Sequence, residues 1–214
     1  MTARRSFLAR IGTAAAAFGL GRSATMHAQS AAPAGPYQPA RHDKDAWFDQ
    51  IPGKHRIFFD VLTPQGVGEA IGYAENFFEA NQSGYGLGDA ELAVVICLRH
   101  MSTPFAFGDG FWAKYGAQLG ETLKVTDPKT GQAPVINTRR AALEALAKRG
   151  VHFAVCDLAS HRFAGMMARR NNGDADAVYK EMQVAVLSNA TFVPAGIVAV
   201  NRSQEHGYAI AYVG

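Results

Sequence analysis

Apolar residues are concentrated in five short runs, and each run predicts a β-strand. The runs cover residues 55–62, 91–98, 151–156, 190–193 and 208–213. The second run is almost continuously apolar, which is typical of a parallel strand that helices cover on both faces. The pattern therefore predicts a sheet that is buried on both sides.

Between these runs, apolar residues recur at spacings of three and four, as in amphipathic helices. A long helix is expected to follow the first strand and to end near residue 84. Further helices are expected within 108–120, from Asn137 or Thr138 to Arg149, from an N-cap at Ser160 to about residue 170, and over 175–187. This alternation predicts an α/β fold, a three-layer α/β/α domain with a mainly parallel five-stranded sheet.

Residues 195–206 are compatible with two structures. The apolar run at 197–200 suits a strand, whereas Pro194 before the segment and Gly207 after it suit the two ends of a helix. The residues alone leave both alternatives open.

The charge of the chain is unevenly distributed. The formal net charge of the 214 residues is +3, but the first 28 residues hold four arginines and no acidic residue. The remainder has 17 basic and 18 acidic residues, a net charge of −1, so no basic excess points to nucleic acid. No apolar run approaches the roughly 18 residues of a stable membrane span. Two cysteines are too few for a disulfide framework.

The N-terminal segment carries an adjacent arginine pair, Arg4 and Arg5, followed by Ser-Phe-Leu and an acid-free segment rich in Ala and Gly. This pattern is typical of a twin-arginine export signal. We therefore expect a signal peptide over 1–28, recognition of the pair by the export machinery, and a periplasmic or otherwise exported protein. The alternative is a basic tail or an uncleaved anchor. Residues 29–50 are predicted to be a linker and 51–214 the folded domain.

Cys156 stands at the end of the third predicted strand, directly before a helix. Parallel sheets collect ligands at this edge, and a helix N-terminus there favours thiolate over thiol. His161 and Arg162 follow in the first helical turn, and Arg99 and His100 lie at the tip of the second strand. These four side chains are therefore candidate substrate-binding groups around a catalytic thiol.

The residues alone do not decide whether Cys156 is reactive or which role Cys97 has. Cys156 is equally compatible with a small buried core residue, and the Asp157 carboxylate beside it would oppose thiolate formation. Cys97 is predicted to be buried, but it could also act as a resolving thiol or pair with Cys156. The spacings among the Cys and His residues match no ligand pair, so neither a metal nor another cofactor is expected.

The C-terminal half contains a recurring combination of residues. These are Gly150, Val151, Phe153, Val155 and Cys156, then Val193, Pro194, Gly196, Ile197, Gln204, Gly207, Tyr208 and Tyr212. Together with the first strand, the helix around Asn76 and residues 111–115, they resemble the exported branch of the DsrE/DsrF-like family over residues 53–214. The resemblance implies a compact α/β/α domain, a trimer or hexamer, a helix over 194–206, and a persulfide on Cys156.

Two hypotheses of function follow. The first is an exported DsrE-like protein that binds or relays sulfane sulfur on Cys156, as a sulfur carrier or sulfurtransferase. The second is a non-enzymatic module of the same fold that binds a small ligand or supports assembly. In both cases a homo-oligomer is expected, with the aromatic segment 105–115 offering apolar surface to a partner subunit.

Overall fold

The computed structural model describes residue 36 and residues 38–214. The predicted signal peptide, with Arg4 and Arg5, lies outside the described residues, as does part of the predicted linker. The folded unit runs from Pro39 to Gly214. Within the described part of the chain, no helix combines the length and the apolar character that crossing a membrane requires.

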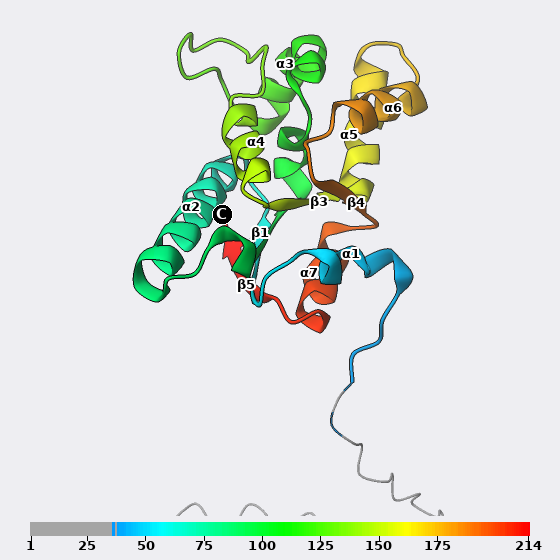
Figure 1. Cartoon of the computed structure of the whole chain (residues 1–214). Coiled ribbons are helices and arrows are strands. Elements are labelled where there is room, and N and C mark those ends of the chain that lie inside the picture. The colour runs from blue at the N-terminus through cyan, green and yellow to red at the C-terminus, as the bar shows by residue number, and fades with distance from the viewer. Residues whose placement is uncertain (1–35, 37) are drawn as a thin grey trace, which may run out of the picture. The chain divides into compact units, whose positions relative to one another are not determined.

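The sheet contains five strands, all parallel, in the order β4-β3-β2-β1-β5 (Figure 1). The strands are β1 (His55–Val61), β2 (Leu92–Leu98), β3 (His152–Cys156), β4 (Ala190–Val193) and β5 (Ala209–Val213). The five predicted strands are therefore confirmed to within one residue at each end. Since β2 and β3 are neighbours in the interior of the sheet, the tips that carry Arg99 and Cys156 lie side by side.

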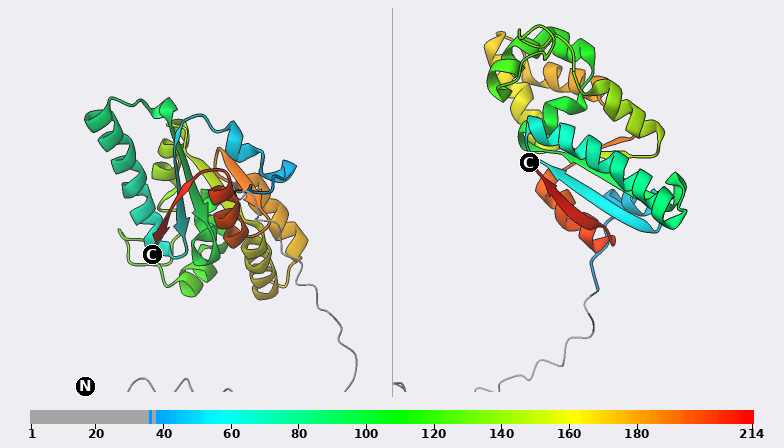
Figure 2. Two further views of the ribbon diagram at one scale, coloured as in Figure 1. Left: turned by 90° about the horizontal axis from the view of Figure 1, so that it is seen from below. Right: turned by 90° about the vertical axis from the view of Figure 1, so that its left-hand side faces the viewer.

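Helices cover both faces of the sheet (Figures 1 and 2). The helices are α1 (Trp47–Gln50), α2 (Pro64–Tyr85), α3 (Asp109–Leu123), α4 (Arg140–Lys148), α5 (Asp157–Arg170), α6 (Ala175–Ala185) and α7 (Gly196–Glu205), with 3-10 turns η1 (Asp43–Asp45), η2 (Asp89–Glu91) and η3 (His100–Ala106). One core joins Phe59 and Phe153 of the sheet to α2 through α6, and a second joins Phe58 and Cys97 to α1 and α7. This is the predicted three-layer α/β/α architecture.

Helix α2 shows how local sequence sets the ends of an element. The Thr63 hydroxyl accepts a hydrogen bond from the Gly66 amide at 3.0 Å, and Pro64 takes the first helical position, where no amide hydrogen is needed. The helix ends at Tyr85 and is capped by Gly86, whose φ of 68° is a left-handed conformation that glycine adopts without strain.

Two other helix starts differ from the sequence-based expectation. Ser160 is not an N-cap, because α5 already begins at Asp157 and the Ser160 hydroxyl donates to the carbonyl of Cys156 at 3.0 Å. The N-cap of α5 is Cys156 itself. Helix α4 begins at Arg140, and its N-cap is Arg139 rather than Asn137 or Thr138. The Asn137 side chain accepts a hydrogen bond from the Arg139 amide, which precedes the helix. A side-chain hydroxyl can bond to a carbonyl four residues back, so the residue type does not fix where the helix starts.

The segment 105–115 does not form an apolar surface. Phe105, Phe111, Trp112 and Tyr115 are each at most 3% exposed and belong to the core under α3, so the expectation that they offer a surface to a partner is wrong. Within residues 195–206, for which the residues alone allowed two structures, Gly196–Glu205 form the helix α7.

The segment 39–50, predicted as linker, includes η1 and α1. Phe48 of α1 is fully buried and packs against Phe58 and Tyr208. The Tyr208 hydroxyl also donates to the Phe48 carbonyl at 3.0 Å. These contacts attach the start of the folded unit to the face of the sheet that α7 covers.

Candidate functional site

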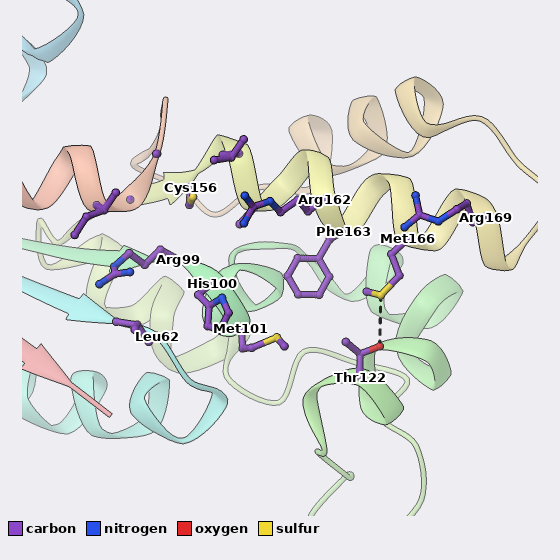
Figure 3. A pocket seen from close by; sticks show the side chains of 15 residues that line it. Leu62, Arg99, His100, Met101, Thr122, Cys156, Arg162, Phe163, Met166 and Arg169 are labelled. Atoms are coloured by element: carbon purple, nitrogen blue, oxygen red, sulfur yellow. Dashed lines mark hydrogen bonds between the residues drawn. The ribbon is translucent and has the colours of Figure 1, made fainter.

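A pocket of about 580 Å³ opens at the carboxyl ends of β2 and β3 (Figure 3). Its walls come from the loop after β1, η3, α3, α5 and the start of α7. The lining residues are Leu62, Arg99, His100, Met101, Thr122, Cys156, Leu158, Ala159, Arg162, Phe163, Met166, Arg169, Ala195, Gly196 and Ile197. The pocket therefore lies where parallel α/β sheets bind their ligands.

Cys156 is the last residue of β3 and lines this pocket. The residue is only 7% exposed, so it is packed on most sides and reaches open space through the pocket. A reagent would therefore meet the sulfur only after entering the pocket.

Two helices begin at the pocket, α5 after Cys156 and α7 after Ala195. Neither N-cap residue supplies a side-chain hydrogen bond to the first turn. The first amides of a helix have no partner within the helix and carry the positive end of its dipole. Both helix starts therefore favour an anionic ligand in this region.

Three arginines also line the pocket, and they differ in their pairing. Arg99 forms a bidentate ion pair with Asp60, with Nε–Oδ1 and Nη2–Oδ2 distances of 2.5 and 2.8 Å. The hydrogen bond to Asp60 raises the pKa of the Arg99 guanidinium. Arg162 and Arg169 are exposed and form no ion pair within the described residues. The uncompensated positive charge in the pocket is therefore carried by Arg162 and Arg169.

His100 also lies in the pocket wall, with an unusual backbone. Its φ is 56°, in the left-handed region that non-glycine residues seldom adopt. Such conformations cost energy and concentrate at functional positions. The conformation lies at the turn from β2 into η3 and places His100 next to Arg99 on the pocket wall (Figure 3).

Gly196 is needed for the packing of Arg99 beside the pocket. A Cβ at position 196 would lie 2.4 Å from Cβ and 2.5 Å from Cδ of Arg99. Gly196→Ala should therefore lower the free energy of unfolding by about 2 kcal/mol, through overpacking against an atom fixed to the backbone. Urea denaturation measures the change. Gly110→Ala is the control, because nothing lies within 4 Å of its added methyl group. Equal stability of both variants would contradict the packing described here.

His161 is not brought to the pocket with the other predicted residues. Its ring stacks on Tyr179 of α6 with a centroid distance of 3.9 Å, and Nε2 lies 3.8 Å from Oδ1 of Asp157. The Tyr179 hydroxyl donates to the same Asp157 oxygen at 2.5 Å. Burial, together with this hydrogen bond, raises the pKa of Tyr179 to about 12. The carboxylate expected to oppose the thiolate is therefore hydrogen-bonded to α6 and does not line the pocket.

Cys97 lies fully buried in β2 below the pocket. Burial raises the pKa of its thiol well above the usual value. In the strand register, Cys97 faces Ala154, and Cys156 is two residues further along. At about 4.8 Å between strands and about 3.3 Å per residue, the two cysteine Cα atoms are roughly 8 Å apart, beyond the reach of about 7 Å for a disulfide. Both cysteines are free.

We therefore expect that mild oxidation of the protein forms no bond between Cys97 and Cys156. After oxidation, unfolding in the presence of an alkylating reagent should label both cysteines of the monomeric protein, as read by intact mass. In the native protein only Cys156 should be labelled, because Cys97 is inaccessible and has a raised pKa. An oxidised monomer that takes up no label after unfolding would contradict this arrangement.

The described residues contain no group of three or more His, Cys, Asp or Glu side chains that could hold a metal ion. The two cysteines and the two histidines near them are separated: Cys97 is in the core, His161 packs on α6, and Cys156 and His100 share the pocket. The arginine side chains that line the pocket are hydrogen-bond donors with positive charge, so they suit an anionic ligand rather than a cation.

Sequence reasoning found Cys156, Arg99, His100 and Arg162 but missed the far half of the pocket. Arg169 and Met166 lie on the same face of α5 as Arg162, at spacings of three and four residues, and all three line the cleft. The helical spacing could have identified them. The contribution of Thr122 from α3 depends on tertiary packing and has no local signal.

The sequence matches no family model and no curated protein. Among solved structures, the chain is similar to a protein of unknown function, MTH1491 from Methanobacterium thermoautotrophicum. The two share 14% sequence identity with a TM-score of 0.43, over 74% of this chain and 99% of that chain.

Proposed function

We propose that this protein is an exported, DsrE-like sulfur carrier that accepts sulfane sulfur on Cys156. The family assignment depends on the motif around Cys156 and on the C-terminal combination of residues described above. The location, periplasmic or otherwise exported, depends on the arginine pair at Arg4 and Arg5. Assembly into a trimer or hexamer is part of the same proposal.

The observation that carries the proposal is the position of Cys156 at a pocket with positive charge. The thiol stands at the start of α5, near the start of α7, with Arg162 in the same wall. A persulfide is more acidic than a thiol, so its anion would be stabilised by the same helix amides and guanidinium. These groups would favour both the attacking thiolate and the product.

The proposed reaction is a transfer of one sulfur atom. The Cys156 thiolate attacks the outer sulfur of a donor such as thiosulfate. A sulfur–sulfur bond to Cys156 forms, the sulfur–sulfur bond of thiosulfate breaks, and sulfite leaves with the electron pair. No external oxidant or reductant is needed, and the Cys156 persulfide can pass its outer sulfur to an acceptor thiolate in the same way.

Intact mass spectrometry tests the proposal. After incubation with thiosulfate or polysulfide, the wild-type protein should gain the mass of sulfur, and reduction should remove it. Cys156→Ser should gain none, whereas Cys97→Ser should behave like the wild type, because Cys97 is fully buried and does not line the pocket. Absence of an adduct on the wild type, or an undiminished adduct on Cys156→Ser, would reject the proposal.

The low exposure of Cys156 and the apolar side chains of the pocket favour a second candidate function. In this alternative the protein is a non-enzymatic module that binds a small ligand, and Cys156 is a packing residue. A thiol that is inert in the native protein, in a pocket that still binds ligand after Cys156→Ala, would support this alternative.

A further inference from the structure

The pocket continues well beyond the thiol. Its volume of about 580 Å³ lies within the range of roughly 300–1,000 Å³ that holds small organic molecules. Thiosulfate, with five heavy atoms, would occupy only the region near Cys156. The remaining space follows α5 towards its C-terminal end, as Figure 3 shows for Arg162, Phe163, Met166 and Arg169.

The middle of the pocket is apolar. Phe163 and Met166 come from α5, and Met101 of η3 lies across from them (Figure 3). The Thr122 hydroxyl of α3 lies 3.8 Å from the Met166 sulfur and closes this wall. Contact with apolar walls contributes little to the binding of a small hydrated inorganic anion. It contributes more to the binding of an organic ligand, whose carbon and sulfur atoms are removed from water.

Positive charge is present at two separate points along the same helix face. Arg162 lies near Cys156, and Arg169 follows seven residues later, about 10 Å further along the helix axis. The Arg169 side chain extends back over Gly165, one turn earlier in α5. A Cβ built on Gly165 would lie 3.3 Å from Nη1 of Arg169. The guanidinium is therefore directed towards the end of α5 that begins after Cys156. Neither arginine forms an ion pair within the part of the chain described, so both can bind an anion.

We infer that the sulfur donor or acceptor of this protein is a small organic thiol that carries a carboxylate, in its persulfide form when it is the donor. The persulfide end would lie at Cys156 and Arg162, the carbon chain against Phe163 and Met166, and the carboxylate on Arg169. This inference rests on the proposed function of Cys156 and specifies its substrate class.

The transfer is balanced without a further reactant. The Cys156 thiolate attacks the outer sulfur of R–S–SH, a sulfur–sulfur bond to Cys156 forms, and the sulfur–sulfur bond of the organic persulfide breaks. The proton remains on the outer sulfur, and the organic thiol leaves as the thiolate R–S⁻ with the electron pair. The reverse reaction returns the sulfur to an organic thiol.

The test compares three donors on the full-length protein: glutathione persulfide, which carries carboxylates; the persulfide of N-acetylcysteamine, which carries none; and thiosulfate. Initial rates of Cys156 sulfuration are followed by intact mass. The wild type should react fastest with glutathione persulfide. Arg169→Gln should slow that reaction about tenfold, the size expected for loss of one charge-assisted hydrogen bond, and leave the rate with N-acetylcysteamine persulfide unchanged.

Arg170→Gln is the matched control, because Arg170 is the next residue on α5, pairs with Glu121 at 3.0 Å and does not line the pocket. It should change none of the three rates. Equal rates for the three donors, or an unchanged rate with glutathione persulfide in Arg169→Gln, would overturn the inference and leave Cys156 as a sulfur carrier of broader specificity.

A second measurement separates the two proposals. S-methylglutathione cannot transfer sulfur, and its binding to Cys156→Ala can be followed by calorimetry. If S-methylglutathione binds about tenfold more weakly to the double variant Cys156→Ala/Arg169→Gln than to Cys156→Ala, the inferred ligand class is supported. If this dependence is seen while no donor sulfurates the wild type, the sulfur-carrier function falls and the carboxylate site remains. If no binding is detected, the inferred ligand class is wrong.

Discussion

Asp60→Asn should lower the free energy of unfolding by about 3 kcal/mol, because it leaves the Arg99 guanidinium without its counter-charge in a partly buried position. The Asp60 and Arg99 side chains are only 7% and 19% exposed, and two hydrogen bonds join them. Asparagine keeps the shape of the side chain, so the loss would report on charge. Urea denaturation of the two proteins gives the difference.

Asp89→Asn is the matched control for this prediction. Asp89 also forms a bidentate pair, with Arg149, at 2.9 and 3.0 Å, but these side chains are 40% and 38% exposed. Its loss should change stability by at most about 1 kcal/mol, because water screens an exposed pair. Combining Asp60→Asn with Arg99→Met should recover part of the loss. Similar effects of Asp60→Asn and Asp89→Asn would show that burial does not set the strength of the Asp60–Arg99 pair.

Gly116→Ala should cost about 3 kcal/mol of unfolding free energy, although alanine is the better helix former. A Cβ on Gly116 would lie 1.8 Å from the Pro134 carbonyl oxygen, an atom of the backbone that cannot rotate away. A Cβ on Gly120, one turn later, would lie 2.8 Å from the ring carbon Cδ of Pro134. The two glycines let the loop that contains Pro134 pack directly on α3, whose Thr122 forms part of the pocket wall.

The control for Gly116→Ala is Gly72→Ala in the interior of α2. Nothing lies within 4 Å of a Cβ at position 72, so the substitution should raise the free energy of unfolding by about 0.5–1 kcal/mol. Thermal or urea denaturation measures both variants. Stabilisation by Gly116→Ala would show that Pro134 does not approach α3 as described.

The strands and most helices could be predicted from the sequence, because buried elements carry their own hydrophobic period. The continuous apolar run of β2 and the glycine stop at Gly150, with φ of 95°, are local signals. Helix starts were less predictable. Ser160 has the residue type of an N-cap, but the same hydroxyl bonds backwards to Cys156 within α5.

The part of the candidate site that lies at the strand tips was easier to predict from the sequence than the part that lies on helices. Cys156 and Arg99 end neighbouring parallel strands, so the order of strands brings them together. His161 follows Cys156 just as closely as Arg162 in sequence, yet the helix turns it to Tyr179, and periodicity alone does not say which face meets the pocket. Likewise, aromatic composition could not tell that Trp112 is buried.

The most direct test of the central claim is the alkylation rate of Cys156 in the native protein by iodoacetate and by iodoacetamide. If Cys156 opens into a pocket with positive charge, the anionic reagent should react several-fold faster, relative to the neutral one, than it does with N-acetylcysteine. Arg162→Gln should reduce this ratio and Arg170→Gln should not. Labelling of Cys156 only after unfolding, or a ratio equal to that of N-acetylcysteine in all three proteins, would contradict the account.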